Sequence, residues 1–152
     1  IIGIFNQDYV WHDDAQSWQG PDGETAVPSM IDLPDADLAG FFAHLGMGQS
    51  VPHKVAPWVN NEMGQAILGL YRSAAQPAMG NLGDDLHTAS QRPGLSIIAT
   101  EDTYTGGEKL HRQAAEKCGA DIAVLDGLGH WWMCEDPTRS AEMLNSWLEG
   151  LD

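Results

Sequence analysis

The sequence predicts an α/β fold in which parallel strands are flanked by helices. Two apolar runs of strand length, residues 95–100 and 122–125, alternate with two segments of helical periodicity. Strand, loop, helix, strand, loop and helix in this order are typical of parallel strands joined by right-handed crossover connections. Before them, residues 6–90 contain no convincing strand, so we expect a mostly helical region there.

Composition favours a globular protein that does not bind nucleic acid. The chain has 152 residues, of which 43% are hydrophobic, and this is enough for one domain with a core. Its formal net charge of −15 repels phosphate backbones and anionic membrane surfaces. We therefore expect a small-molecule substrate as partner, with no nucleic acid and no membrane.

The two cysteines, Cys118 and Cys134, are too few for a disulfide framework and lack metal-type spacing. The sequence contains no apolar run of 18 residues, and its first residues do not resemble a signal peptide. We therefore expect a cytoplasmic location, no metal and no cofactor.

The first five residues, Ile1-Ile2-Gly3-Ile4-Phe5, are typical of the end of a buried core strand. No initiator methionine precedes them, and we expect the chain to be a fragment of a longer protein.

The helical region, residues 6–90, begins with aromatic and acidic residues. Histidine and two aspartates follow one another in Trp11-His12-Asp13-Asp14, but adjacent residues do not converge on one metal ion. We expect Trp11, His12 and Trp18 either to line one side of a substrate pocket or to pack within this helical region.

The strongest helical periodicity follows Asn60 and Asn61, either of which can cap the helix. Arg72 lies within this pattern, and we expect it to face solvent and pair with a carboxylate. The predicted apolar stripe consists of Met63, Ala66, Ile67, Leu70, Ala74, Ala75 and Ala78.

Residues 91–152 carry the strand and helix alternation. The strand at 95–100 leads through a polar loop to a helix whose inner face is predicted to hold Leu110, Ala114 and Cys118. The strand at 122–125 precedes the loop Gly127-Leu128-Gly129-His130-Trp131. The last helix is predicted to begin with Asp136 as cap and Pro137 at its first position. Its predicted buried residues are Ala141, Leu144, Leu148 and Leu151, and the predicted surface histidines are His44, His53, His87 and His111.

Two side chains on these loops have catalytic potential. Asp102 follows the first strand and His130 follows the second, and active groups of parallel sheets lie beyond the carboxyl ends of the strands. A carboxylate bonded to one imidazole nitrogen leaves the other nitrogen free as a general base. Each residue also has a structural alternative. His130 can be a structural histidine packed beside tryptophans, and Asp102 can be a carboxylate in the loop that leads into the next helix.

This part of the chain resembles the α/β-hydrolase family. The resemblance rests on a strand ending in Glu101-Asp102, a helix, a second strand, the Gly127–Trp131 element and a helix opened by Asp136-Pro137. In that family the chain order is nucleophile, acid, histidine, which Asp102 and His130 continue. The resemblance implies the carboxy-terminal part of an α/β-hydrolase sheet, with 1–5 as the end of a core strand, 6–90 as a helical cap and 91–152 as the α/β part.

The sequence departs from that family at the nucleophile. The family's Gly-x-Ser-x-Gly elbow is absent, and Gly48-Gln49-Ser50-Val51-Pro52 lacks its last glycine. We therefore expect the carboxy-terminal half of a hydrolase of roughly 250 to 300 residues, with the nucleophile in a missing amino-terminal half that completes the fold. The chain alone should be inactive.

The predicted function is hydrolysis of an ester, amide or related bond by a nucleophile-His-Asp triad. His130 is the predicted base, Asp102 its orienting acid, and Trp11, His12, Trp18 and Trp131 are candidate substrate contacts. The nucleophile can be serine, cysteine or aspartate, and aspartate would imply dehalogenase or epoxide-hydrolase chemistry. A noncatalytic binding or interaction module, in which His130 is structural, is the alternative.

Overall fold

A computed structural model of the chain describes residues 9–11 and 13–151. The predicted strand at 1–5 and His12 lie outside these residues. The chain divides into two compact units. One contains Trp11–Ala78, and the other contains residues 9–10 and 79–151.

The first unit, Trp11–Ala78, is built from helices alone in its described part. Its elements are α1 (Asp13–Gln19), α2 (Gly23–Ile31), α3 (Asp35–Phe42), the π-helical turn η2 (Ala43–Met47), α4 (Pro52–Val55), the 3-10 turn η3 (Ala56–Trp58) and α5 (Asn61–Ser73). Leu38, Ala39 and Ala56 form a buried cluster between α3 and η3. Asn60 caps α5, its side chain accepting a hydrogen bond from the Met63 amide, as predicted.

The buried stripe of α5 differs from the prediction. Met63 and Leu70 are exposed, whereas Gly64 and Leu68 are buried. A Cβ built on Gly64 would lie 3.2 Å from a methyl group of Val27, so the missing side chain lets α2 approach α5 closely. The hydrophobic pattern does not register such a contact, because glycine contributes no apolar side chain to it.

Arg72 pairs with a carboxylate at the surface, as predicted. Its guanidinium lies 2.8 Å from Glu24 Oε1, and the two side chains are 37% and 60% exposed. Such exposed pairs contribute little, about 0–1 kcal/mol.

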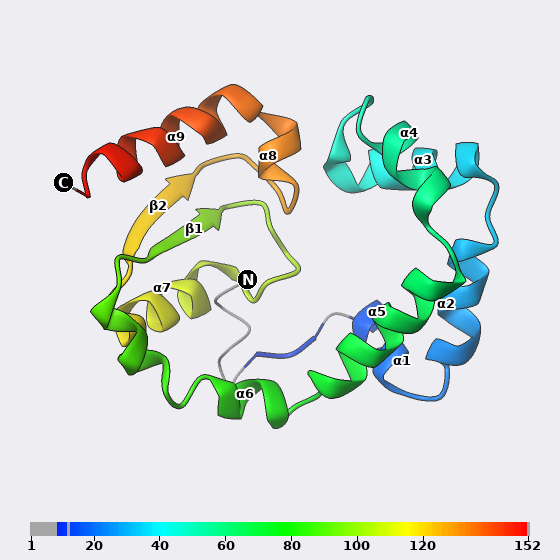
Figure 1. The fold of residues 1–152 in the computed structure, drawn as a ribbon, viewed down its shortest axis with the longest axis horizontal. Helices are drawn as coiled ribbons and strands as arrows, with labels where there is room; N and C mark the ends of the chain where they lie inside the picture. The colour runs from blue at the N-terminus through cyan, green and yellow to red at the C-terminus, as the bar shows by residue number, and fades with distance from the viewer. Residues whose placement is uncertain (1–8, 12, 152) are drawn as a thin grey trace. The chain divides into compact units, whose positions relative to one another are not determined.

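The second unit contains the sheet (Figure 1). Its elements are α6 (Ala78–Leu82), the 3-10 turn η4 (Leu86–Gln91), β1 (Leu95–Ala99), α7 (Gly107–Cys118), β2 (Asp121–Leu125), α8 (Trp132–Glu135) and α9 (Pro137–Glu149). The strands β1 and β2 pair in parallel, from Leu95 opposite Asp121 to Ala99 opposite Leu125. On β1, Ser96 and Ile98 are buried, and α7 packs along that strand.

The predicted fold class is wrong. The described residues are mostly helical, and their sheet has only the two strands β1 and β2. A doubly covered α/β-hydrolase sheet needs several strands to bury its faces, and only two described runs adopt strand conformation. The alternation of strands and helices that suggested the family is a local pattern. A single pair of parallel strands with its helices is enough to produce it.

The inner face predicted for the last helix is also wrong. Ala141, Leu148 and Leu151 are exposed, and Leu144 is half-buried. Polar contacts also hold α9: Ser140 donates to the Trp132 carbonyl, and Trp147 Nε1 donates to Asp121 Oδ2 at 2.9 Å. No described helix has the length and apolar character needed to span a membrane.

The cap of α9 offers a test of the helix that follows the histidine loop. Asp136 accepts a hydrogen bond from the Arg139 amide at 3.0 Å, with Pro137 at the first helical position, as predicted. We expect Asp136→Ala to lower the free energy of unfolding by about 1 kcal/mol, because the Arg139 amide loses its partner. Urea unfolding followed by circular dichroism measures this, and the exposed Glu142→Ala is the matched control on the same helix. An equal effect of both variants would contradict the capping role.

Candidate active site

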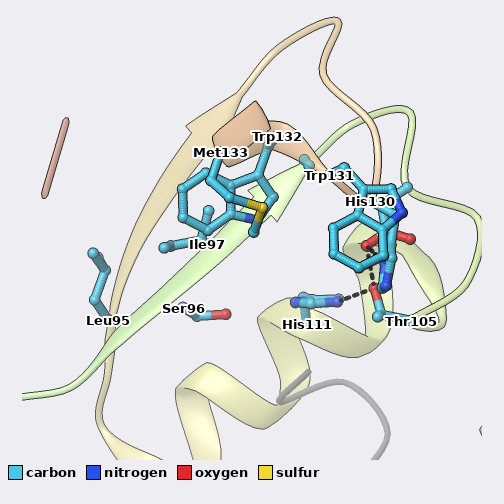
Figure 2. A pocket seen from close by; sticks show the side chains of 11 residues that line it. Leu95, Ser96, Ile97, Thr105, His111, His130, Trp131, Trp132 and Met133 are labelled. Carbon is cyan, nitrogen blue, oxygen red and sulfur yellow. Dashed lines mark hydrogen bonds and ion pairs between the residues drawn. The ribbon is translucent and has the colours of Figure 1, made fainter. Parts of the chain in front are cut away.

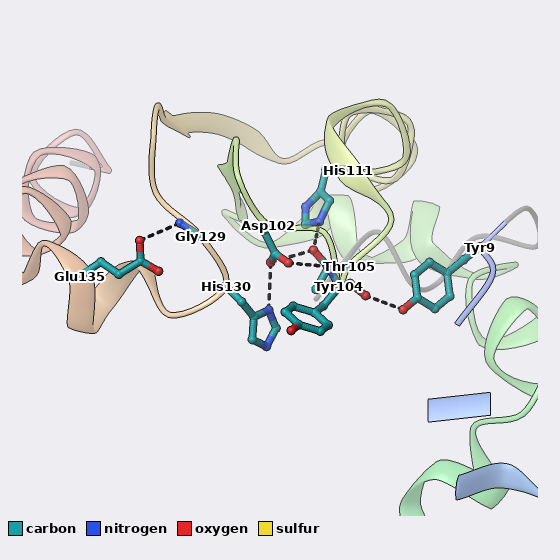
Figure 3. A network of polar contacts seen from close by, with 8 residues as sticks. All are labelled: Tyr9, Asp102, Tyr104, Thr105, His111, Gly129, His130 and Glu135. Carbon is teal, nitrogen blue, oxygen red and sulfur yellow. Dashed lines mark hydrogen bonds and ion pairs between the residues drawn. The ribbon is translucent and has the colours of Figure 1, made fainter. Parts of the chain in front are cut away.

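Asp102 and His130 meet beyond the carboxyl ends of the two strands. Nδ1 of His130 lies 3.0 Å from Oδ2 of Asp102 (Figure 3). Asp102 follows β1 and His130 follows β2, and in a parallel pair these ends lie at the same edge of the sheet. The structure thus brings together the two side chains that the sequence predicts as acid and base.

The two loops are bonded to each other before they reach these residues. The Glu101 amide donates to the Leu128 carbonyl at 2.9 Å, and the Gly127 amide donates to Thr100 Oγ1 at 2.8 Å. Gly127 has a φ of 75°, which favours glycine at this turn. Hydrogen bonding therefore continues past the strands and holds the loop that carries Asp102 against the loop that carries His130.

Each loop also has its own anchor. The Gly129 amide donates to Glu135 Oε2 at 2.9 Å, tying the residue before His130 to α8 (Figure 3). The buried Tyr9 donates its hydroxyl to the Tyr104 carbonyl at 2.6 Å. These contacts fix the backbone on both sides of the Asp102–His130 pair.

Asp102 is held in its ionised form. Burial alone would raise the pKa of this carboxyl, but hydrogen bonds from His130, the Tyr104 amide and the Thr105 hydroxyl lower it below its usual value. Oδ1 accepts from the Tyr104 amide at 2.8 Å, and Oδ2 accepts from Thr105 Oγ1 at 3.0 Å as well as from His130. An ionised carboxylate only accepts hydrogen bonds.

This acceptor determines the tautomer of His130. Because Asp102 cannot donate, Nδ1 of His130 must carry the proton that they share in the hydrogen bond, and in the neutral ring Nε2 keeps its lone pair. Nε2 has no hydrogen-bond partner among residues 9–11 and 13–151. The His130 side chain is 33% exposed and that of Asp102 is 11% exposed, so the imidazole is the more accessible member of the pair.

Aromatic rings limit the orientations open to His130. The rings of Tyr104 and Trp131 meet it edge-on, with centroids 5.1 and 5.4 Å away. Trp131 therefore packs against the predicted base, and it also lines the hollow described next.

A hollow of about 430 Å³ adjoins the pair within the same unit (Figure 2). Its volume falls in the range of small-molecule sites. The residues that line it are Leu95, Ser96, Ile97, Ala99, Asp102, Thr105, His111, His130, Trp131, Trp132 and Met133. Aromatic and aliphatic side chains thus surround a few polar groups beside the Asp102–His130 pair.

The sequence analysis missed two members of the network. Thr105 Oγ1 donates to Asp102 and lies 2.9 Å from Nε2 of His111, which is buried rather than at the surface as predicted. A signal was present, since residues 111, 114, 115 and 118 recur at steps of three and four and all four are buried. His111 is predicted at the surface because it lies on a polar or helical stretch where the sequence shows no partner for it.

The remaining predicted substrate contacts lie elsewhere. Trp11 and Trp18 belong to the helical unit, where their rings lie 5.2 and 5.0 Å from the ring of Tyr71. Neither lines the hollow beside His130, and their role in substrate binding stays a prediction. Among the residues that the structure describes, no group of three or more side chains is arranged to hold a metal ion.

The tautomer of His130 can be observed directly. At pH 8, ¹⁵N spectra of histidine-labelled chain should show His130 protonated at Nδ1 and bare at Nε2. Asp102→Asn should reverse this, because the amide can present its NH₂ group to Nδ1. The exposed Asp84→Asn serves as control, and a spectrum unchanged by Asp102→Asn would exclude Asp102 as the group that sets the tautomer.

His111 should make stability depend on pH. Burial lowers the pKa of His111 in the folded chain. The His111 side chain is therefore protonated near pH 6.5 in the unfolded chain, whereas in the folded chain it is protonated only at lower pH. Stability is therefore full above about pH 6.5 and falls as the pH drops below it towards the folded pKa. Urea midpoints at pH 7.5 and 5.5 should differ more in the unmodified chain than in His111→Gln. The exposed His87→Gln is the control, and an equal pH dependence in His111→Gln would contradict the assignment.

No protein-family model, no curated protein and no solved structure matches this chain. The likeness to α/β-hydrolases therefore stays a prediction drawn from the sequence motifs. The chemistry of the site rests on its own geometry.

Proposed function

We propose that Asp102 and His130 are the acid and the base of a nucleophile-His-Asp hydrolase that cleaves an ester, amide or related bond in a small molecule. The observation that carries the proposal is the 3.0 Å hydrogen bond between His130 Nδ1 and Asp102 Oδ2, which leaves Nε2 unbonded within the described residues. The chain order of acid before histidine and the Gly-x-Gly-His-Trp element support it.

The residues of this chain would perform the proton transfers. Nε2 of His130 takes the proton of a serine or cysteine nucleophile as it attacks the carbonyl carbon. The resulting imidazolium is stabilised by the Asp102 carboxylate and gives its proton to the leaving group. Nε2 then takes a proton from water as the water oxygen attacks the acyl intermediate, and the imidazolium returns that proton to the nucleophile as the acid is released.

The nucleophile itself is assigned to polypeptide outside these 152 residues, because the sequence lacks a nucleophile elbow. An aspartate at that position would make His130 the base for water in dehalogenation or epoxide opening. The proposal places the protein in the cytoplasm with a small-molecule substrate. The net charge of −15 disfavours polyanionic partners.

Turnover by the protein encoded by the complete coding sequence tests the proposal. With p-nitrophenyl butyrate as substrate, His130→Ala should lower kcat/KM by about 10²–10⁴, because general-base catalysis is lost. The exposed His87→Ala should leave it unchanged. If kcat/KM falls by less than about tenfold in His130→Ala, His130 is not the general base. That result would favour the noncatalytic binding module.

A fluorophosphonate probe identifies the nucleophile in the same preparation. Labelling of the complete protein indicates serine, whereas turnover of haloalkanes without labelling indicates aspartate. The 152-residue chain alone should neither be labelled nor turn over the ester. Labelling of that chain would place a reactive serine within it and contradict the assignment of the nucleophile.

A further inference from the structure

Two residues that line the hollow each carry a buried polar atom without a hydrogen-bond partner in the described chain. Ser96 is 2% exposed and His111 is 5% exposed. Ser96 Oγ and His111 Nδ1 form no hydrogen bond with any residue of the described chain. Buried polar groups are almost always hydrogen-bonded to protein or to ordered water, and a ligand can take the place of that water. Both residues line the same hollow, so their missing partner can lie inside it.

The hydrogen-bond network decides what His111 offers. The single hydroxyl proton of Thr105 is donated to Asp102, which as a carboxylate accepts only. Thr105 Oγ1 must therefore accept from His111 Nε2, 2.9 Å away. The proton of neutral His111 is thus on Nε2, and Nδ1 presents a bare lone pair. The wall offers an acceptor at this point.

Ser96 offers the complementary group. Its hydroxyl points to the side of the hollow on which His111 lies (Figure 2). With no partner in the described chain, Oγ retains a proton to donate. Trp131, Trp132 and Met133 complete the hollow with apolar surface. The wall thus combines one acceptor and one donor with an apolar enclosure.

We infer that this hollow is a binding subsite for a hydroxyl group carried by an uncharged, largely apolar small molecule. The ligand hydroxyl donates to His111 Nδ1 and accepts from Ser96 Oγ, which satisfies both orphaned atoms at once. A carboxylate would face the lone pair of Nδ1. An ammonium group finds no carboxylate reserved for it there, because Asp102 already accepts three of the roughly four hydrogen bonds that a carboxylate can take.

The inference narrows the substrate class of the proposed hydrolase and in that respect rests on the proposed function. The hydroxyl subsite lies in the same hollow as Asp102 and His130. A substrate held there would carry a free hydroxyl group besides its scissile bond.

Binding of four matched probes to the unmodified 152-residue chain tests the subsite. Benzyl alcohol, toluene, benzylamine and benzoate share one ring and differ in the polar group. Titrations followed by ¹H–¹⁵N spectra of histidine-labelled chain should show benzyl alcohol binding at least about tenfold more tightly than the other three, the gain expected from satisfying buried polar groups. Only benzyl alcohol should shift the His111 Nδ1 resonance.

Equal affinities would overturn the inference and leave an apolar hollow without polar selectivity. Tighter binding of benzylamine or benzoate would overturn it in favour of a charged ligand. A His111 spectrum with the proton on Nδ1 would remove the acceptor and have the same consequence.

A serine variant assigns the contact. Ser96→Ala should reduce the preference for benzyl alcohol over toluene about tenfold, whereas Ser146→Ala, at an exposed serine of α9, should leave it intact. A preference retained in Ser96→Ala would exclude the serine as donor. Toluene binding reports whether the variant has kept the hollow, so a folding defect is distinguished from a lost contact.

The binding test of the hydroxyl subsite and the hydrolysis test of the proposed function can fail independently. If benzyl alcohol shows no preference while His130→Ala abolishes hydrolysis in the complete protein, the subsite alone is wrong. If benzyl alcohol binds as expected and His130→Ala leaves hydrolysis intact, the hydrolase proposal is wrong and the hollow remains a hydroxyl-binding site.

Discussion

The hydrogen bond between His130 Nδ1 and Asp102 Oδ2 is the contact on which the site depends. It spans two loops that are distant in sequence, and it forms because β1 and β2 are parallel and in register. A shift of either strand by one residue would turn its side chains to the opposite face. The bonds from Gly127 to Thr100 and from Glu101 to Leu128 extend that register to the site itself.

Proton positions in the network follow from one charged group. Because Asp102 is ionised and accepts only, every neighbour that reaches it must donate. This fixes the proton of His130 on Nδ1 and the proton of Thr105 towards the carboxylate. The same rule, passed on through Thr105, fixes the proton of His111 on Nε2. One carboxylate thus sets two imidazole tautomers, and both rings present a bare nitrogen on the side away from it.

The sequence supports the site better than it supports the fold. The Asp102–His130 contact follows from two short strands and the rule that polar groups gather at their carboxyl ends. His111 escaped prediction because its position repeats with Ala114, Ala115 and Cys118 but its chemistry does not. The exposed apolar residues of α9 could not be foreseen, since amphipathic spacing indicates which residues share a face and not whether anything covers that face.

The failure of the predicted fold class and the presence of the predicted pair have a common cause. A strand, a loop acid, a helix, a second strand and a loop histidine form a local unit, and the geometry of an Asp–His pair needs only that unit. Any fold that contains two adjacent parallel strands with these loops can present the same pair, so the pair carries information about chemistry and very little about the surrounding architecture. The glycine-histidine-tryptophan element is local in the same way: Gly129 is held by Glu135 and His130 by Asp102, both within this unit. The proposed hydrolase chemistry therefore depends on proton transfer by His130 and not on the number of strands beside it.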